Sequence, residues 1–318
     1  MRLLNQSCEA FVQEPGLDGI YKQIERAGRT CYKSTDKITP ESAKPFVDRM
    51  IKSNHTAMLE HGTVYLTITY NPENKEDRKL LGKYLENPYT KVVSKILESP
   101  DLNKPLSEQK IGETIRVTKA IAYITTNLRV IVENDLWDDL KYLCEPTEYH
   151  KKRYTLSCTT ALHCYKDLTR HRVFSFAIES TRYCNYSKTE KFGDMAFIIP
   201  TWINLKEGQY FDGKYGTSLF EDFLKSSTYS KTTERFILDL VGVERTYNEL
   251  VENGWQAQQA AEVLPQCIKG DMIITGFEDD WKHLLDLRYY GTTGAPHPMV
   301  KELATLMKEE LEKLGFNY

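Results

Sequence analysis

Apolar residues recur along the chain with the spacing of helices in some segments and of strands in others. Residues 16–54 carry the helical spacing and are predicted to form two helices, the second beginning at Thr39 and Pro40. Residues 64–69 alternate between apolar and polar positions, as a strand with one buried face does. Residues 119–132 give the next strand signal. The N-terminal half is therefore expected to combine helices with strands.

The second half of the chain continues this mixture. Residues 154–168 pass from strand to helix character, and a short strand is expected at 195–199, before Pro200. The C-terminal third has helical spacing, with helices predicted at 236–250, 255–268, 277–288 and 298–314. Strands and helices do not alternate regularly, which argues against a doubly wound parallel sheet. The prediction is an α+β fold, in which helices flank a central and mostly antiparallel sheet.

A polar, lysine-rich stretch separates the two strand signals of the N-terminal half. Residues 71–115 show no core-forming period beyond one short helix. The stretch is therefore predicted to be a surface insertion outside any chemistry, because it also contains no catalytic motif. Its lysine runs at 75–84 and 104–110 are expected to face solvent.

Composition excludes several classes of protein. The chain has 318 residues and a formal net charge of −3, so the overall basic balance of a nucleic-acid-binding protein is absent. Its seven cysteines include no C-x-x-C pair, which argues against a disulfide framework or a zinc site and favours a reducing cytoplasm. No apolar run approaches the roughly 20 residues of a membrane helix, and residues 1–13 do not resemble a signal peptide.

The densest positive charge lies in residues 169–183, TRHRVFSFAIESTRY. Arg170, Arg172 and Arg182 offer fork-shaped donors that match phosphate and carboxylate oxygens. Cations in a segment that also carries core-type apolar residues need an anionic partner. The residues alone leave two partners open: a phosphate-bearing ligand, or acidic side chains on neighbouring helices. The 45 Asp and Glu residues of the chain make the second easy to satisfy.

The spacing in this segment resembles the signature of one enzyme family. Arg170-His171-Arg172, seven residues and then Ser180 is the R-H-R-x7-S signature of flavin-dependent thymidylate synthases, and it continues as Ser180-x-Arg182-Tyr183. Further segments that resemble the family follow in its order: GRTCY at 28–32, His55 before Glu60-His61, VLP at 263–265, and Trp281-x-His283-x3-Leu287-Arg288. The resemblance implies one domain over 1–318, with an insertion at about 70–153 relative to shorter members.

This resemblance also implies an activity. Members of the family make dTMP from dUMP, taking the one-carbon unit from methylenetetrahydrofolate and reducing power from NADPH through FAD. They are homotetramers in which each site is built from several subunits around FAD. The chain is therefore expected to be a cytoplasmic flavoprotein with small-molecule substrates, and neither a nucleic acid nor a membrane is an expected partner.

Residue roles carry over from the family to the matching positions. The residues expected to hold FAD are His55, Glu60, Arg170, His171, Arg172 and His283, with Cys31 near them. The residues expected to bind dUMP are Asp167, Arg170, Glu179, Ser180, Thr181, Arg182 and Arg288, with Arg182 on the phosphate. Arg288 is expected to stabilise the negative charge of the activated uracil ring. Ser180 is expected to donate a hydrogen bond to the nucleotide, and these two residues are the catalytic candidates.

Some residues depart from the family pattern. Ala261 stands where the family has an arginine, and Phe277 departs from its T-x-N pattern. These departures leave open a flavin- or nucleotide-binding homologue with altered or lost methylation activity. Zinc-binding helices place histidines four residues apart around a glutamate, a spacing that His55, Glu60 and His61 do not match. No metal is therefore expected.

Two side chains of the motif segment could act as nucleophiles. Cys184 lies near several arginines, which would favour its thiolate form. Ser180 would need an aligned base, without which a serine is a poor nucleophile. A scheme with no enzymic nucleophile is preferred, because Cys184 lies past the signature.

Overall fold

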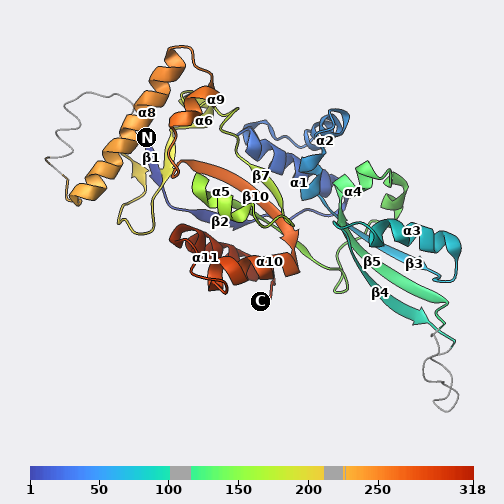
Figure 1. Ribbon diagram of the computed structural model, residues 1–318. Helices are drawn as coiled ribbons and strands as arrows, with labels where there is room; N and C mark the ends of the chain where they lie inside the picture. The colour runs from blue at the N-terminus through green and yellow to red at the C-terminus, as the bar shows by residue number, and fades with distance from the viewer. Residues whose placement is uncertain (101–115, 211–224, 226) are drawn as a thin grey trace.

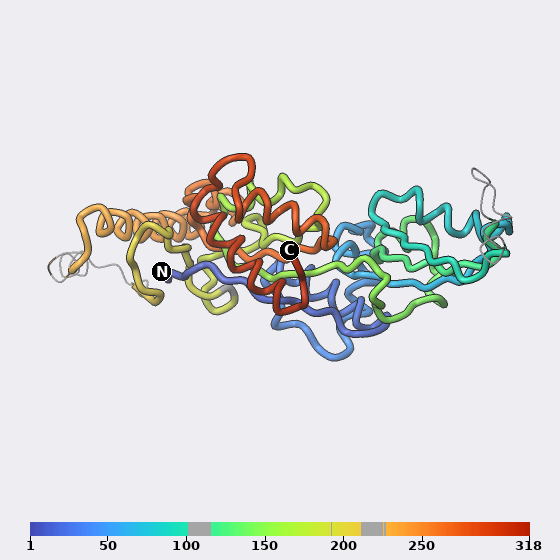
Figure 2. Tube along the Cα trace, turned by 90° about the horizontal axis from the view of Figure 1, so that it is seen from below, coloured from blue at the N-terminus to red at the C-terminus, as the bar shows by residue number. Residues whose placement is uncertain are grey.

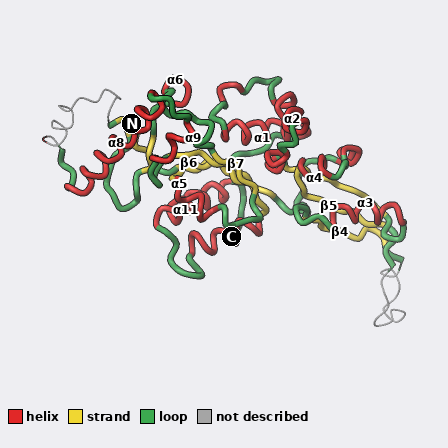
Figure 3. Tube along the Cα trace, turned by 45° about the horizontal axis from the view of Figure 1, so that its top comes forward, coloured by secondary structure: helices red, strands yellow, loops and turns green. Residues whose placement is uncertain are grey.

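The computed structural model describes residues 1–100, 116–210, 225 and 227–318. The molecule is elongated, with a long helix near the N-terminus at one end and a three-stranded sheet at the other, as Figures 1 and 2 show. A four-stranded sheet lies between these ends, and helices cover both of its faces (Figure 3). The predicted mixture of helices and antiparallel strands is confirmed.

Four antiparallel strands form the central sheet, in the order β2-β6-β10-β7. Their bounds are β2 Ser7–Ala10, β6 Arg153–Ala161, β10 Lys269–Phe277 and β7 Ser175–Ile178. The register pairs Ile273 with Ser157 of β6 on one side and with Ala177 of β7 on the other. Strand β10 is thus a central strand, whereas the sequence pattern predicted no strand there.

Successive residues of β10 point to opposite faces of this sheet. Met272 and Ile274 join the core under helices α10 (Glu278–Leu285) and α11 (Pro298–Lys313). Ile273 packs instead with Ala27 of helix α1 (Gly16–Cys31). This alternation is the ordinary period of a strand. It produces two separately covered faces, called here the α1 face and the α11 face.

A second antiparallel sheet lies beyond the α1 face, in the order β3-β5-β4. Its strands are β3 Thr63–Tyr70, β5 Lys119–Asn127 and β4 Lys91–Glu98, and helix α3 spans Lys75–Leu85. The sheet packs on α1 through an apolar core that includes Ile24 and Ile124. This sheet and α1 therefore share one core.

The prediction for residues 71–115 was only partly right. The short helix is present as α3, and its lysines are exposed. However, α3 buries Leu81 and Tyr84 in the core, and the Tyr84 hydroxyl donates to Asp139 at 2.9 Å. Strand β4 was also not predicted. The lysine run at 104–110 lies outside the described residues, as do all residues of 101–115.

A third, small sheet closes the other end of the molecule. It consists of β8 (Ala196–Ile198), β1 (Arg2–Leu4) and β9 (Gly208–Gln209), and the β1–β8 pair is parallel. Helix α8 (Lys231–Glu252) covers it by burying Ile237 and Leu240. The predicted strand at 195–199 is confirmed as β8.

Several predicted helix boundaries were shifted or wrong. The remaining elements are α2 Ala43–Lys52, α4 Leu128–Glu133, α5 Leu162–Leu168, α6 Thr189–Phe192, α9 Ala257–Ala260, the 3-10 helices η1 Thr35–Lys37, η2 Thr56–His61, η4 Trp137–Tyr142 and η5 Ala261–Val263, and the π-helical turn Asp286–Tyr290. The second helix therefore starts at Ala43, after the Thr39–Pro40 start that the sequence suggested. The helix predicted at 255–268 is wrong, because only α9 and η5 are helical there.

The predicted strand at 119–132 ends early, and helix α4 follows it directly. Asn127 causes this change, because its side chain accepts from the Val130 backbone N–H and caps α4. Within the described part of the chain, no helix has the length and apolar content needed to cross a bilayer.

Candidate functional site

Arg288 is held in one orientation by the end of α5 and the turn that follows it, on the α11 face. It lies in the π-helical turn that follows α10, which Gly291 ends with a φ of 70°. Its Nε donates to His171 Nε2 at 3.2 Å, and its Nη2 donates to the Asp167 carbonyl oxygen at 2.9 Å. The Asp167 carboxylate lies 3.7 Å from Nη1. The guanidinium is therefore a fixed cation, with a direction set by its neighbours.

His171 is a neutral acceptor in this arrangement. Its side chain is buried, and burial together with the charges of Arg288 and His283 lowers its pKa to about 4. Because Nε2 accepts from Arg288, the ring proton resides on Nδ1. The His283 ring lies 5.9 Å from the His171 ring, centroid to centroid. His171 thus positions Arg288 and is unsuited to exchange protons near neutral pH.

The other arginines of the motif, Arg170, Arg172 and Arg182, are exposed. Arg170, Arg172 and Arg182 have no carboxylate within ion-pair distance among the residues that the structure describes. The guanidinium of Arg182 lies over the Tyr183 ring, 5.7 Å from its centroid. The alternative that acidic neighbours neutralise the motif is therefore wrong for these three arginines. Their donors remain available to an anion from outside the described chain.

Arg170 lines a cavity of about 660 Å³ on the same side of the molecule as Asp167. Trp202, which is exposed, and His297 form an aromatic wall, with ring centroids 5.9 Å apart. Lys166 adds a second cation to the lining. A cavity of this size, with cations beside an indole ring, suits a planar ligand that carries negative charge.

Cys31 and His55 lie together on the α1 face, in a cavity of about 480 Å³. Arg129 and Tyr183 also line this cavity. Glu60 does not line it, but its carboxylate pairs with the Arg129 guanidinium. The two N-terminal segments that the family resemblance placed near FAD, 28–32 and 55–61, are therefore adjacent here.

Ser180 connects the motif to this second cavity. Its backbone N–H donates to the Cys31 carbonyl oxygen at 2.9 Å, and its Oγ accepts from the Arg182 backbone N–H at 3.3 Å. No histidine within the described ranges hydrogen-bonds to Ser180 Oγ. Without a base, the hydroxyl can act as a hydrogen-bond donor but is a poor nucleophile. The side chain of Thr181, the next residue, is partly exposed.

Glu179 is buried, and its carboxylate is hydrogen-bonded or ion-paired to several groups of its own chain. Its carboxylate accepts from the Tyr186 hydroxyl at 2.8 Å and from Lys269 Nζ at 3.2 Å. Lys33 Nζ lies 3.5 Å away, and the Asp271 backbone N–H donates at 3.2 Å. These contacts join the end of β7 to the start of β10. If Glu179 binds dUMP as expected, its carboxylate would contact the nucleotide and these residues at the same time.

Cys184 has the opposite character to the one the sequence suggested. The side chain is buried, and burial together with the nearby Glu179 raises the pKa of its thiol to about 11. The arginines of the motif do not lower it. A thiol with this pKa is almost entirely protonated at neutral pH and is a poor nucleophile.

His61, next to Glu60, is part of the core. Its Nδ1 shares a hydrogen with Thr275 Oγ1 at 2.9 Å, and Thr275 contacts Thr155 at 2.8 Å. Gln23 donates to Thr155 at 3.0 Å and completes the chain of buried polar groups. Full burial lowers the pKa of His61 to about 3. The described residues contain no group of three or more metal-binding side chains.

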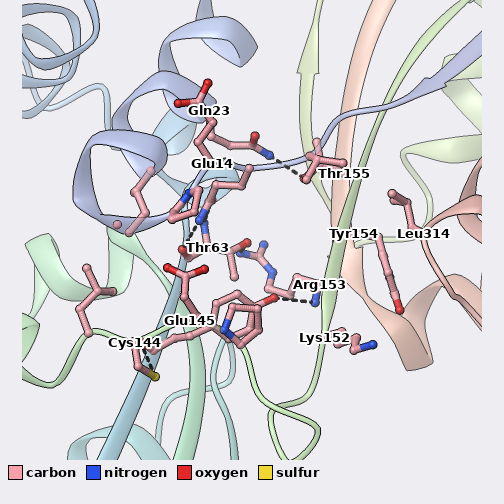
Figure 4. Close-up of a pocket in the computed structure, with 18 of the residues that line it drawn as sticks. Glu14, Gln23, Thr63, Cys144, Glu145, Lys152, Arg153, Tyr154, Thr155 and Leu314 are labelled. Carbon is pink, nitrogen blue, oxygen red and sulfur yellow. Dashed lines mark hydrogen bonds between the residues drawn. The ribbon is translucent and has the colours of Figure 1, made fainter.

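A third cavity, of about 510 Å³, lies where the central sheet meets the β3-β5-β4 sheet. Figure 4 shows its lining, with Gln23 hydrogen-bonded to Thr155 and with Arg153 and Glu145 among the residues drawn. Arg153 Nη1 donates to the Glu60 carbonyl oxygen at 3.1 Å, and burial lowers the pKa of its guanidinium to about 10. None of the residues predicted to bind FAD or dUMP lines this cavity.

The family model described as thymidylate synthase complementing protein matches residues 147–314. The chain belongs to this family. The match contains the whole Arg170–Ser180 signature, the VLP segment and Arg288, and so it confirms the resemblance seen in the sequence. Cys31, His55 and Glu60 lie outside the matched range.

Solved structures similar to the chain include two nucleotide-modifying enzymes. The UMP/dUMP methylase PolB from Streptomyces cacaoi, bound with 5-Br dUMP, has 14% identity and a TM-score of 0.41, over 99% of this chain and 93% of that one. Thymidylate synthase X from Helicobacter pylori, with FAD and dUMP, has 12% identity and a TM-score of 0.36, over 96% and 92%. No curated protein matches the sequence significantly.

The predicted residues fall into two groups on opposite faces of the central sheet. Asp167, His171, His283 and Arg288 gather on the α11 face, whereas Cys31 and His55 share the cavity on the α1 face. The sequence pattern gave no sign of Arg129, Lys33 or Lys269, which hold the predicted carboxylates Glu60 and Glu179. Lys269 and Asp271, two charges two residues apart before the apolar Met272–Ile274, are the one signal that could have drawn attention.

Proposed function

We propose that the chain catalyses the reductive methylation of dUMP to dTMP, with methylenetetrahydrofolate as the one-carbon donor and NADPH as the reductant through FAD. The observation that carries the proposal is the contrast among the motif arginines. Arg170, Arg172 and Arg182 have no acidic partner in the described ranges, while Arg288 is fixed by His171 and Asp167. Guanidinium groups without an acidic partner suit the binding of ligand phosphates. A guanidinium group with a fixed orientation suits the stabilisation of negative charge that develops during a reaction.

The free arginines would bind the phosphates. Arg182 would hold the dUMP phosphate, and Arg170 and Arg172 would hold FAD, with Arg170 also reaching the nucleotide. His55, Glu60, His171, His283 and Cys31 complete the proposed FAD set, and Asp167, Glu179, Ser180 and Thr181 complete the proposed dUMP set. FAD, when bound, would supply the electrons that convert the transferred one-carbon unit to a methyl group.

Arg288 would act on the uracil ring. Negative charge develops on the ring oxygen when the ring is activated, and a donor that is already oriented stabilises it without reorganisation. The contacts from His171 and Asp167 supply that orientation, and the partly buried position strengthens the interaction. Ser180 would donate a hydrogen bond to the nucleotide. The raised pKa of Cys184 and the lack of a base at Ser180 support a scheme without an enzymic nucleophile.

The complete site would be shared between chains. The two groups of residues lie on opposite faces of one sheet, so ligand contacts from both groups require a second copy. This supports the homotetramer inferred from the family resemblance. The proposed setting is a reducing cytoplasm, as the scattered cysteines without a C-x-x-C pair predict.

Ala261 supports a second candidate function. It lies in η5, where the family has an arginine, and it removes one expected phosphate donor. The alternative is a homologue that binds flavin and nucleotide without methylating. The deciding experiment combines the purified protein with dUMP, NADPH and methylenetetrahydrofolate and measures dTMP, with Arg288→Ala as the control. A yellow protein that forms no dTMP would establish the alternative, and a colourless protein that takes up no added FAD would refute both.

A further inference from the structure

Strand β4 is an open edge of the β3-β5-β4 sheet. Among the described residues it pairs only with β5, and its burial pattern leaves six of its eight residues exposed. Ile96 and Leu97 are 48% and 47% exposed. An edge strand of this length with apolar side chains is a template for pairing with another strand.

The register of β4 fixes which side chains share a face. Val92, Ser94 and Ile96 pair with alternate residues of β5 on the face toward the apolar core. Lys91, Val93 and Lys95 lie on the other face. A bulge between Ile96 and Glu98 advances the chain by one residue, so Glu98 joins the face of the lysines.

These faces make β4 complementary to itself. We propose that β4 pairs antiparallel with β4 of a second copy, about a two-fold axis at Ser94, to form one six-stranded sheet. This register sets Val92 opposite Ile96 and Lys91 opposite Glu98 of the other copy. Each of these two pairs lies on a common face, as antiparallel pairing requires, and combines apolar with apolar side chains or opposite charges, while Val93 lies opposite Lys95.

Neighbouring registers fit less well. An axis at Val93 sets Lys91 opposite Lys95, and an axis at Lys95 sets that residue opposite itself, so both place like charges together. In the present fold, Lys95 Nζ donates to the Tyr149 hydroxyl at 3.1 Å, which keeps the side chain over the sheet face and away from the edge. Glu98 pairs with Lys119 at 3.3 Å on the surface, an exposed contact that leaves the carboxylate accessible.

The partner is therefore a second copy of this chain. The residues assigned to FAD and dUMP do not lie on β4, so this inference stands apart from the proposed function. Its test is chemical crosslinking, with the full chain in mild oxidant and a non-reducing gel as the readout. Three of the seven native cysteines are buried and four are partly exposed, so the unmodified chain is run in parallel to measure the background.

Ser94→Cys is the decisive variant. Opposite Cα atoms in an antiparallel pair are roughly 4.5–5.5 Å apart, a separation within reach of a disulfide. Facing thiols have an effective concentration in the millimolar range, so at about 10 µM protein the crosslink should form roughly 100-fold faster than by random collision. Lys91→Cys is the matched control, because two residues 91 would lie about 20 Å apart in this register.

A second pair of variants tests the register. Glu98→Cys alone should also not crosslink, whereas the double variant Lys91→Cys/Glu98→Cys should do so rapidly. Circular dichroism and thermal melts confirm that each variant is folded. Equal rates for Ser94→Cys and Lys91→Cys, or a double variant no faster than its single variants, would overturn the proposal.

Discussion

Arg288 is the most restrained of the motif arginines, and its neighbours explain why. The sequence identified Arg288, His171 and Asp167 separately, through their places in a family pattern. That they form one hydrogen-bonded unit could not be predicted, because the α5 end and the π-helical turn are far apart along the chain. Burial of His171 is equally invisible in the sequence, yet it decides that the ring is neutral.

Loss of the Arg288 fork should reduce turnover most. We expect Arg288→Ala to lower kcat by roughly 10²–10³-fold, the usual cost of removing one oriented donor to a developing anion. Arg288→Lys should recover little, because a lysine cannot contact His171 and the nucleotide with the same planar fork. Steady-state kinetics against dUMP measures both. Lys282→Ala, a surface change on α10, is the control, and an unchanged kcat in Arg288→Ala would contradict the proposed role.

His171 should make the protein sensitive to acid. Its pKa falls from 6.5 to about 4 on folding, so the unfolded chain binds the proton more readily and stability is lost as the pH falls from 6.5 toward 4. A shift of this size corresponds to roughly 3 kcal/mol at full effect. Urea unfolding at about pH 7 and about pH 4.5 measures the loss. His171→Gln should lose less between these two conditions, and an equal loss would show that His171 is not the cause.

At the level of elements, the junction of β7 and β10 depends on buried charge. Glu179 directly follows β7, and Lys269 and Asp271 lie at the start of β10, with Lys33, from the turn after α1, closing the network. The sequence placed Glu179 with the nucleotide because of its motif position. It could not show the network, because β10 itself was not predicted. The apolar run of β10 is short and flanked by glycines, Gly270 and Gly276, which weakened the strand signal.

Neutralising Glu179 should loosen this junction. Breaking a buried ion pair by removing one partner costs roughly 3–5 kcal/mol, because the remaining charges lose their compensation. We expect Glu179→Gln to lower the free energy of unfolding by an amount in this range. Denaturant unfolding measures the loss, and the double variant Glu179→Gln/Lys269→Met should be less destabilised than the sum of its single variants. Strict additivity would show that the two groups do not interact.

The region between 71 and 115 illustrates a different limit of the sequence. Its polar pattern correctly predicted one helix and an exposed lysine face. Leu81 and Tyr84 are nevertheless buried. The sequence did not reveal this, because two buried side chains are too few to produce a recognisable helical period. Strand β4 was missed because it is mostly exposed, so its residues do not alternate between apolar and polar. Deleting the whole segment would therefore remove core contacts as well as surface.

At the scale of the molecule, the central sheet separates arginines that the sequence assigned to one site. Arg288 belongs to the α11 face, while Arg182 lies beside Tyr183, which lines the cavity of the α1 face. The sequence predicted which residues bind the ligands. It could not show that these residues lie on two different faces of one chain. Strand alternation decides the face of each element, and it can only be read once the strands are known.

Mixed oligomers test whether the site is shared. If each site takes Arg288 from one chain and Arg182 from another, then Arg288→Ala and Arg182→Ala, each inactive alone, should complement when co-expressed with different tags. In an equal mixture about a quarter of the sites would contain both arginines, as follows from random assembly of a symmetric oligomer. Tandem purification followed by the dTMP assay measures the recovery, and two differently tagged Arg288→Ala chains serve as the control. If both arginines instead act within one chain, every site in the mixture lacks one of them, and the hybrid would be as inactive as its parents.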